Sequence, residues 1–174
     1  MTGLILTTDG FEDSELTYPY YRLQEAGIDV DVATPDGESA EGKHGEEIEA
    51  DLAIEEAQSD EYDLLVLPGG YAPENLRLEA PEAADIVGEF DADGKPIASI
   101  CHGVQLLISA DVLDGRDVTG YWSLEVDVEN AGATFVDEAA VVDDNLISSR
   151  APKDLPAFMA RTLEHAEERA IAAD

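Results

Sequence analysis

Short apolar runs recur along the chain, separated by polar turns and by stretches with helical spacing. The run at residues 62–67 is apolar apart from Asp63, which is typical of a strand covered on both faces of a sheet. Strands are predicted at residues 3–7, 28–33, 62–67, 96–100 and 117–119, and a hairpin at 139–142 and 146–149. The segment 42–54 is polar and contains two glycines, so it predicts a hairpin or an irregular excursion.

Apolar residues at intervals of three and four predict helices between these strands. The helices are expected at residues 14–26, 81–90, 102–110, 123–131 and 154–172. The alternation favours an α/β fold: a doubly wound, mostly parallel, flavodoxin-like sheet sandwiched by helices, with one domain spanning 1–174. Ligands bind beyond the carboxyl ends of such strands, where the loops after Thr7, Leu67 and Ile100 would converge.

The charge balance narrows the classes of partner. The chain has 41 acidic and nine basic residues, a formal net charge of -32. This charge argues against nucleic acid as a partner, because a phosphate-binding surface is basic. It also favours a halophilic protein, because concentrated salt screens the self-repulsion of so acidic a surface. An acidic interaction surface in an ordinary cell is the alternative.

Cysteine content and hydropathy bear on the compartment. With one cysteine, Cys101, no intrachain disulfide can form, and a reducing cytoplasm is the expected location. No apolar run approaches the roughly 20 residues of a membrane helix, and no signal-like segment is evident. We therefore expect neither membrane insertion nor secretion.

Cys101 lies in a segment that is typical of a nucleophile elbow. Ser99 and Gly103 place small residues two positions before and after it, where a strand turns sharply into a helix. The turn is expected to expose the thiol above the sheet edge, and the helix N-terminus to favour its thiolate. The alternative is a cysteine that merely fills the core.

Three further positions are candidates for the same strand-end crevice. His102 can act as a base or stabilise a thiolate, or it can simply start the helix. Glu12 follows the first strand and can keep its proton and donate it to sulfur, or it can be a helix-start charge. The backbone after Leu67, at Gly69 and Gly70, can form an oxyanion hole or only a turn.

Metal and phosphate-binding cofactors are not expected. The three histidines lie far apart in the sequence, no pair of residues has ligand spacing, and no glycine-rich phosphate loop is present.

Several of these segments together resemble the ThiJ/PfpI family, most closely the PfpI-type intracellular cysteine proteases. The similar blocks are residues 11–16, 18–19, 67–70, 98–103, 130–133, 146–150 and 154–158. The resemblance implies a flavodoxin-like fold with Cys101 as nucleophile beside His102. It further implies a hydrogen bond from Glu12 to the sulfur and an oxyanion hole from the backbones of Gly70 and His102.

The resemblance also concerns assembly. In PfpI-like proteins a glutamate after the Pro-Gly-Gly loop completes a triad with the histidine of a neighbouring subunit, and Glu74 matches that position. A catalytically required homo-oligomer is therefore expected. Tyr121 matches an aromatic residue that often borders the pocket, although a place in the core is equally consistent with its sequence.

These features support several functions. The first is a peptidase or related hydrolase in which the Cys101 thiolate attacks a carbonyl of a peptide. The second is a glyoxalase or deglycase that acts on a small reactive aldehyde, methylglyoxal or glyoxal, with the same residues. A non-enzymatic redox sensor or chaperone is the third. A glutamine amidotransferase, suggested by His165 and Glu167, is disfavoured because this pair falls inside the last predicted helix.

Overall fold

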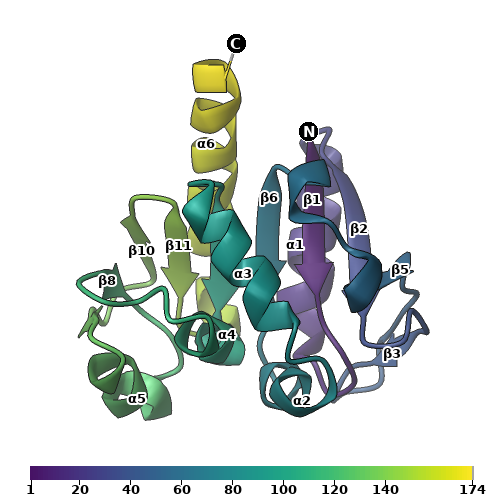
Figure 1. The fold of residues 1–174 in the computed structure, drawn as a ribbon, viewed down its shortest axis with the longest axis horizontal. Coiled ribbons are helices and arrows are strands. Elements are labelled where there is room, and N and C mark those ends of the chain that lie inside the picture. Colours follow the sequence, from purple (N-terminus) through teal and green to yellow (C-terminus); the bar gives the residue numbers. More distant parts are fainter. Residues whose placement is uncertain (174) are drawn as a thin grey trace.

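A seven-stranded sheet forms the centre of the protein, with helices on both faces (Figure 1). The computed structural model describes residues 1–173. Its strands, in spatial order, are β10 (Ala140–Asp143), β11 (Leu146–Ser149), β7 (Ile97–Ile100), β6 (Leu64–Leu67), β1 (Thr2–Leu6), β2 (Asp29–Thr34) and β5 (Leu52–Ala53). Only β10 runs antiparallel to its neighbour. The order β2-β1-β6-β7-β11 is that of a flavodoxin-like fold, as expected.

The helices divide between the two faces of the sheet. One face is covered by α1 (Asp13–Glu25) and α6 (Leu155–Ala173). The other is covered by α2 (Ala72–Glu79), α3 (Ala83–Ala92) and α4 (Val104–Ser109). The short α5 (Glu125–Asn130) lies beside α4, near a small parallel pair formed by β8 (Asp117–Val118) and β9 (Thr134–Phe135).

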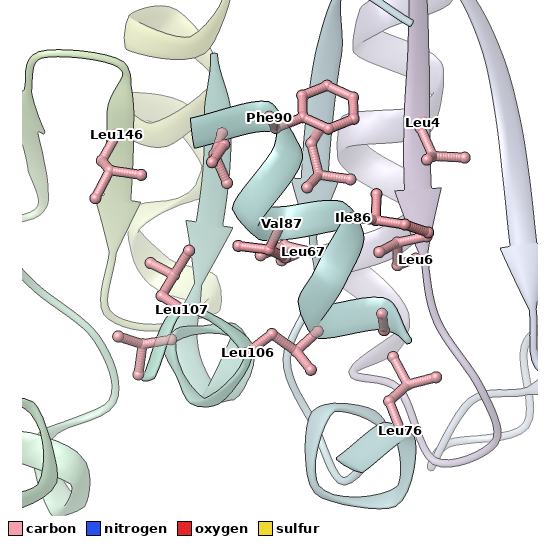
Figure 2. Close-up of a cluster of buried hydrophobic side chains, with 14 of the residues drawn as sticks. Leu4, Leu6, Leu67, Leu76, Ile86, Val87, Phe90, Leu106, Leu107 and Leu146 are labelled. Atoms are coloured by element: carbon pink, nitrogen blue, oxygen red, sulfur yellow. The ribbon is translucent and has the colours of Figure 1, made fainter. Parts of the chain in front are cut away.

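Each face of the sheet has its own apolar core because successive strand side chains point to opposite sides. Along β1, Leu4 and Leu6 pack beneath α3, whereas Ile5 packs on the side of α1 and α6. Figure 2 shows the cluster on the side of Leu4 and Leu6, to which α3 contributes Val87 and Phe90. Because helices cover both faces of the sheet, every residue of β6 and of β7 is buried.

The segment between β2 and β6 contains a hairpin, the first of the two structures expected there, whereas the segment after β6 differs from the expected elements. The hairpin consists of β3 (Ala40–Glu41) and β4 (Glu47–Ile48), and the edge strand β5 follows it as an element that was not predicted. The helix α2 has no counterpart in the predicted elements, because it is short and Pro73 near its start resembles a loop residue in the sequence. The predicted helix at 102–110 begins as a 3-10 turn, Cys101–Gly103, before α4.

Candidate active site

The nucleophile candidate lies where β7 turns sharply into α4. Cys101 has a φ of 59°, a left-handed conformation that is uncommon for a non-glycine residue and is maintained by its surroundings. Gly103 makes the turn possible, because a Cβ there would collide with the carbonyl oxygen of Leu67 and lie 3.0 Å from Ser99 Oγ. The small residue at this position was the sequence signal for the turn.

The two glycines after β6 approach the sulfur from the other side. A Cβ on Gly69 would lie 2.8 Å from the Cβ of Cys101, and Gly70 has a φ of 79°. The backbone N–H groups of Gly70 and His102 both lower the pKa of the Cys101 thiol, so both lie near the sulfur. These are the two amides that the resemblance implied for an oxyanion hole.

The thiol is more buried than the sequence led us to expect. Cys101 is only 6 % exposed, and burial raises the pKa of its thiol, with the negative charge of Glu15 adding to the rise. The two backbone amides act in the opposite direction but do not outweigh burial. The expectation of an exposed thiol with a favoured thiolate is therefore wrong for this state. The sulfur nevertheless faces polar groups on several sides.

The carboxyl group beside the sulfur belongs to Glu15 and not to Glu12, which corrects the expectation from the sequence. Glu15 is fully buried, its Oε2 accepts a hydrogen bond of 2.9 Å from the N–H of Gly69, and this oxygen and Cys101 both border the space that a Cβ on Gly69 would occupy. Its Oε1 has no hydrogen-bond partner among residues 1–173. Burial raises the pKa of Glu15 to about 8, so this carboxyl keeps its proton near neutral pH.

Glu12 occupies a more exposed position at the entrance. Its carboxylate forms an ion pair with Lys43 and lies 3.8 Å from the Nε2 of His44. The side chain of Glu12 is 13 % exposed, compared with 30 % for that of Lys43. Glu12 points to these partners because its backbone is extended before the first turn of α1, whereas Glu15 projects from that turn toward the sheet.

His102 lies beside the sulfur and beneath an aromatic ring. Its Nδ1 is 3.3 Å from Cys101 Sγ, and its ring stacks on Tyr121 with the centroids 4.7 Å apart. Burial lowers the pKa of His102, and the charge of Lys43 lowers it further. Tyr121 is 37 % exposed, so it borders the site and is not a core residue.

Glu74 lies near the start of α2, close enough for its charge to raise the pKa of His102. No carboxylate within residues 1–173 accepts a hydrogen bond from His102.

We call Glu15, Gly69, Gly70 and Cys101 the floor of the site. We call Glu12, Lys43, His102 and Tyr121 its rim. The floor is buried and the rim is partly exposed.

The remaining positions considered in the sequence lie elsewhere. His165 lines a cleft between α6 and β10, together with Asp143 and Arg161, and Cys101 does not line that cleft. The described residues include no group of three or more His, Cys, Asp or Glu side chains that could hold a metal ion. No helix within residues 1–173 has the length and apolar character needed to cross a membrane.

Two residues of the site, Glu15 and Lys43, were missed by the sequence analysis. The signal for Glu15 was its spacing: it precedes the buried Pro19 and Leu23 by four and eight residues, which places a carboxyl on the buried face of α1. Lys43 carried no comparable signal, because it comes from a short polar hairpin outside the main sheet.

Comparison with known proteins gives a consistent family. The DJ-1/PfpI family matches residues 1–165. A deglycase of Pyrococcus abyssi is 52 % identical over 159 residues, which cover 91 % of this chain and 95 % of that protein. Deglycase PfpI of Pyrococcus furiosus is 48 % identical over the same length and coverage. A crystal structure from Anabaena variabilis, of a protein with DJ-1/ThiJ/PfpI-like and ferritin-like domains, is 40 % identical with a TM-score of 0.91, covering 94 % of this chain and 49 % of that one. The chain therefore belongs to the DJ-1/PfpI family.

Proposed function

We propose that the protein is a cysteine-dependent deglycase that removes methylglyoxal or glyoxal adducts from amino groups. The observation that carries the proposal is the buried carboxyl of Glu15 against the Cys101 thiol. A protonated acid beside the nucleophile suits the proton transfers of an α-oxoaldehyde. The deglycase names of several relatives support this function over the peptidase that the sequence analysis put first.

The peptidase function depends on a component that one chain does not supply. A cysteine peptidase uses a histidine that is oriented by a third group and protonates the leaving amine. Within residues 1–173 His102 has no carboxylate hydrogen-bonded to it. The Cys101–Glu15 pair, by contrast, is complete within a single chain.

The reaction that we propose conserves atoms and electrons without a cofactor. Cys101 loses its proton, attacks the carbon that bears the hydroxyl and the amine, and displaces the amine, which takes up a proton. The resulting hemithioacetal isomerises when the hydrogen on this carbon leaves as a proton and a proton is added to the neighbouring carbonyl carbon. The product is a thioester of a 2-hydroxy acid. Water hydrolyses the thioester, which releases lactate, or glycolate from glyoxal, and restores the thiol.

The site residues divide these steps among themselves. Glu15 lies against the sulfur, donates its proton to the departing amine, and as a carboxylate is then placed to carry the proton between the two carbons. The amides of Gly70 and His102 face the sulfur and stabilise negative charge on the substrate oxygen. The His102 ring, 3.3 Å from the sulfur, accepts the thiol proton.

The decisive experiment separates deglycation from consumption of free aldehyde. Purified methylglyoxal-modified N-acetyl-lysine is incubated with enzyme in the presence of excess aminoguanidine, which traps any aldehyde that dissociates. We expect lactate and free amine to form faster than the adduct dissociates alone, and we expect Cys101→Ser to abolish the difference.

Other outcomes identify the alternatives. Turnover of free methylglyoxal, with no acceleration of adduct loss under trapping, would identify a glyoxalase. Cleavage of a fluorogenic peptide by the wild type, but not by Cys101→Ser, would identify a peptidase. Loss of neither substrate, with rapid oxidation of Cys101 seen by intact mass after mild peroxide, would favour the sensor.

We also propose that the protein works as a homo-oligomer in which Glu74 reaches His102 of a neighbouring subunit. Within residues 1–173 no carboxylate is hydrogen-bonded to His102, and this absence and the position of Glu74 near the start of α2 support the proposal. Cys101→Ala is expected to be inactive alone and Glu74→Ala to have lowered activity, because His102 loses the group that orients it; dissociated and reassembled together, the two are expected to regain activity. Such mixing restores activity only if Glu74 acts across subunits, so failure in mixed oligomers confirmed by mass would contradict the proposal.

A further inference from the structure

The hairpin β3–β4 places a lysine at the active site from outside the main sheet. The backbone of the hairpin is fixed to the loop after β1, where Lys43 N donates to Phe11 O at 2.9 Å and Gly10 N donates to Glu41 O at 2.8 Å. The Asp13 carboxylate accepts the N–H groups of His44 and Glu46 at 3.0 and 2.9 Å. The position of Lys43 is therefore set by several hydrogen bonds to the segment that carries Glu12 and Glu15.

The side chain of Lys43 lies over the entrance to the site. Its ammonium group forms an ion pair with Glu12 and lies 5.9 Å from the centre of the Tyr71 ring. The charge acts on three groups below it, Cys101, Glu15 and His102. A positive charge at this place is unusual in a chain with only nine basic residues.

We propose that Lys43 is a positioning residue that holds the Cys101–Glu15 pair in its singly deprotonated, reactive form. When the pair loses one of its two protons it acquires one negative charge, in a buried environment that disfavours charge. The ammonium of Lys43 stabilises that charge and so offsets part of the effect of burial. The proton that leaves goes to solvent or to the His102 ring, and Lys43 itself exchanges none.

Glu12 has the opposite effect on the same pair. Its negative charge raises the pKa of Glu15, whereas the charge of Lys43 lowers it. Within residues 1–173 the charged and titratable groups around the pair include Glu12, Lys43, His44, Tyr71, Glu74, His102 and Tyr121. The two charges of the ion pair at the rim therefore shift the pKa of the buried Cys101–Glu15 pair in opposite directions.

The test measures the ionisation of the thiol directly. Because Cys101 is the only cysteine, its alkylation by iodoacetamide across pH reports one site. This measurement needs no substrate, so its failure and a failure of the proposed deglycase are separable. It is made at the lowest KCl concentration at which each variant keeps the wild-type far-UV circular dichroism spectrum.

We expect Lys43→Met to move the midpoint of the alkylation profile upward by about one pH unit. Lys43→Arg is expected to restore the wild-type midpoint, because it keeps the charge. Glu12→Gln is expected to move the midpoint downward. The matched control is Lys95→Met, which removes a lysine just before β7, about 20 Å along the strand from Cys101, and is expected to leave the midpoint unchanged.

The signs of these shifts decide the proposal. An unchanged midpoint in Lys43→Met, with only a slower rate, would mean that Lys43 has a structural role and would overturn it. An upward shift in Glu12→Gln would also overturn it, because Glu12 would then matter only as the anchor of Lys43. If Lys43→Met does not fold, the proposal still requires a downward shift in Glu12→Gln and an unchanged midpoint in Lys43→Arg.

Discussion

The floor and the rim of the site use the same residue type for opposite purposes. Glu15 on the floor is fully buried and has a pKa raised to about 8, whereas Glu12 on the rim forms an ion pair with Lys43. The two residues are three positions apart in the sequence, yet only one faces the sheet. Environment rather than residue type therefore separates an acid that keeps its proton from a carboxylate that binds a cation.

The largest expected effect is on the floor. Cys101→Ser is expected to lower deglycase kcat/KM by at least about a thousandfold, because the nucleophile is removed while the fold is kept. Adduct loss under aldehyde trapping measures it, with circular dichroism as the control for folding. Residual activity above about one per cent would show that another group performs the attack.

The second effect compares the two glutamates directly. Glu15→Gln is expected to lower kcat/KM about a hundredfold, since it removes the proton carrier but keeps the hydrogen bond from Gly69. Glu12→Gln is expected to cost less than about tenfold, because it changes only a charge at the entrance. The comparison fails if the two variants lose activity equally.

A third expectation concerns the whole acidic surface. We propose that the protein is halophilic, and we expect its Tm to rise by more than about 5 °C between 0.1 M and 3 M KCl, because salt screens the repulsion of a net charge of -32. The activity lost in Glu12→Gln is expected to shrink in high salt, whereas that lost in Glu15→Gln is not. A Tm that does not respond to KCl would contradict the halophilic character.

Substitutions of Tyr121 test how much its stacked ring contributes to the orientation of His102. Tyr121→Ala removes the stack on His102 and is expected to lower kcat/KM roughly three- to tenfold, in line with about 0.5–1.5 kcal/mol for an aromatic pair. Tyr121→Phe keeps the stack and is expected to remain within about twofold of wild type. A large loss in Tyr121→Phe would instead assign a role to the hydroxyl group.

The smallest expected effect is on stability across pH. The pKa of Glu15 is about 8 in the folded protein, above the ordinary value of 4.5, so its stabilising contribution is fully present below about pH 4.5 and is lost as pH rises through 8. The Tm of wild type relative to Glu15→Gln is therefore expected to fall between pH 5 and pH 9. If the Tm values of wild type and Glu15→Gln change with pH in the same way across this range, Glu15 is not buried as described.

Sequence patterns predicted the sheet better than the site. Apolar runs identified the central strands, because strands buried on both faces must be apolar, and the spacing around Cys101 identified the turn. The same patterns placed Glu12 in the strand-end crevice, and the family resemblance implied its hydrogen bond to the sulfur. A pattern places a loop near a strand end but does not show which carboxyl turns inward. The position of Lys43 at the site depends on contacts between the hairpin and the segment after β1, and no local sequence pattern encodes such contacts.

The β3–β4 hairpin has a consequence for how such a protein can change. It pairs with no strand of the central sheet, and its backbone is hydrogen-bonded to the loop after β1 and to the Asp13 side chain at the start of α1. The turn at residues 43–46 can therefore be exchanged while Ala40 and Ile48, which belong to the core cluster that includes Cys101, are kept. Substrate preference in this scaffold is open to engineering through this short turn, which lies outside the central sheet.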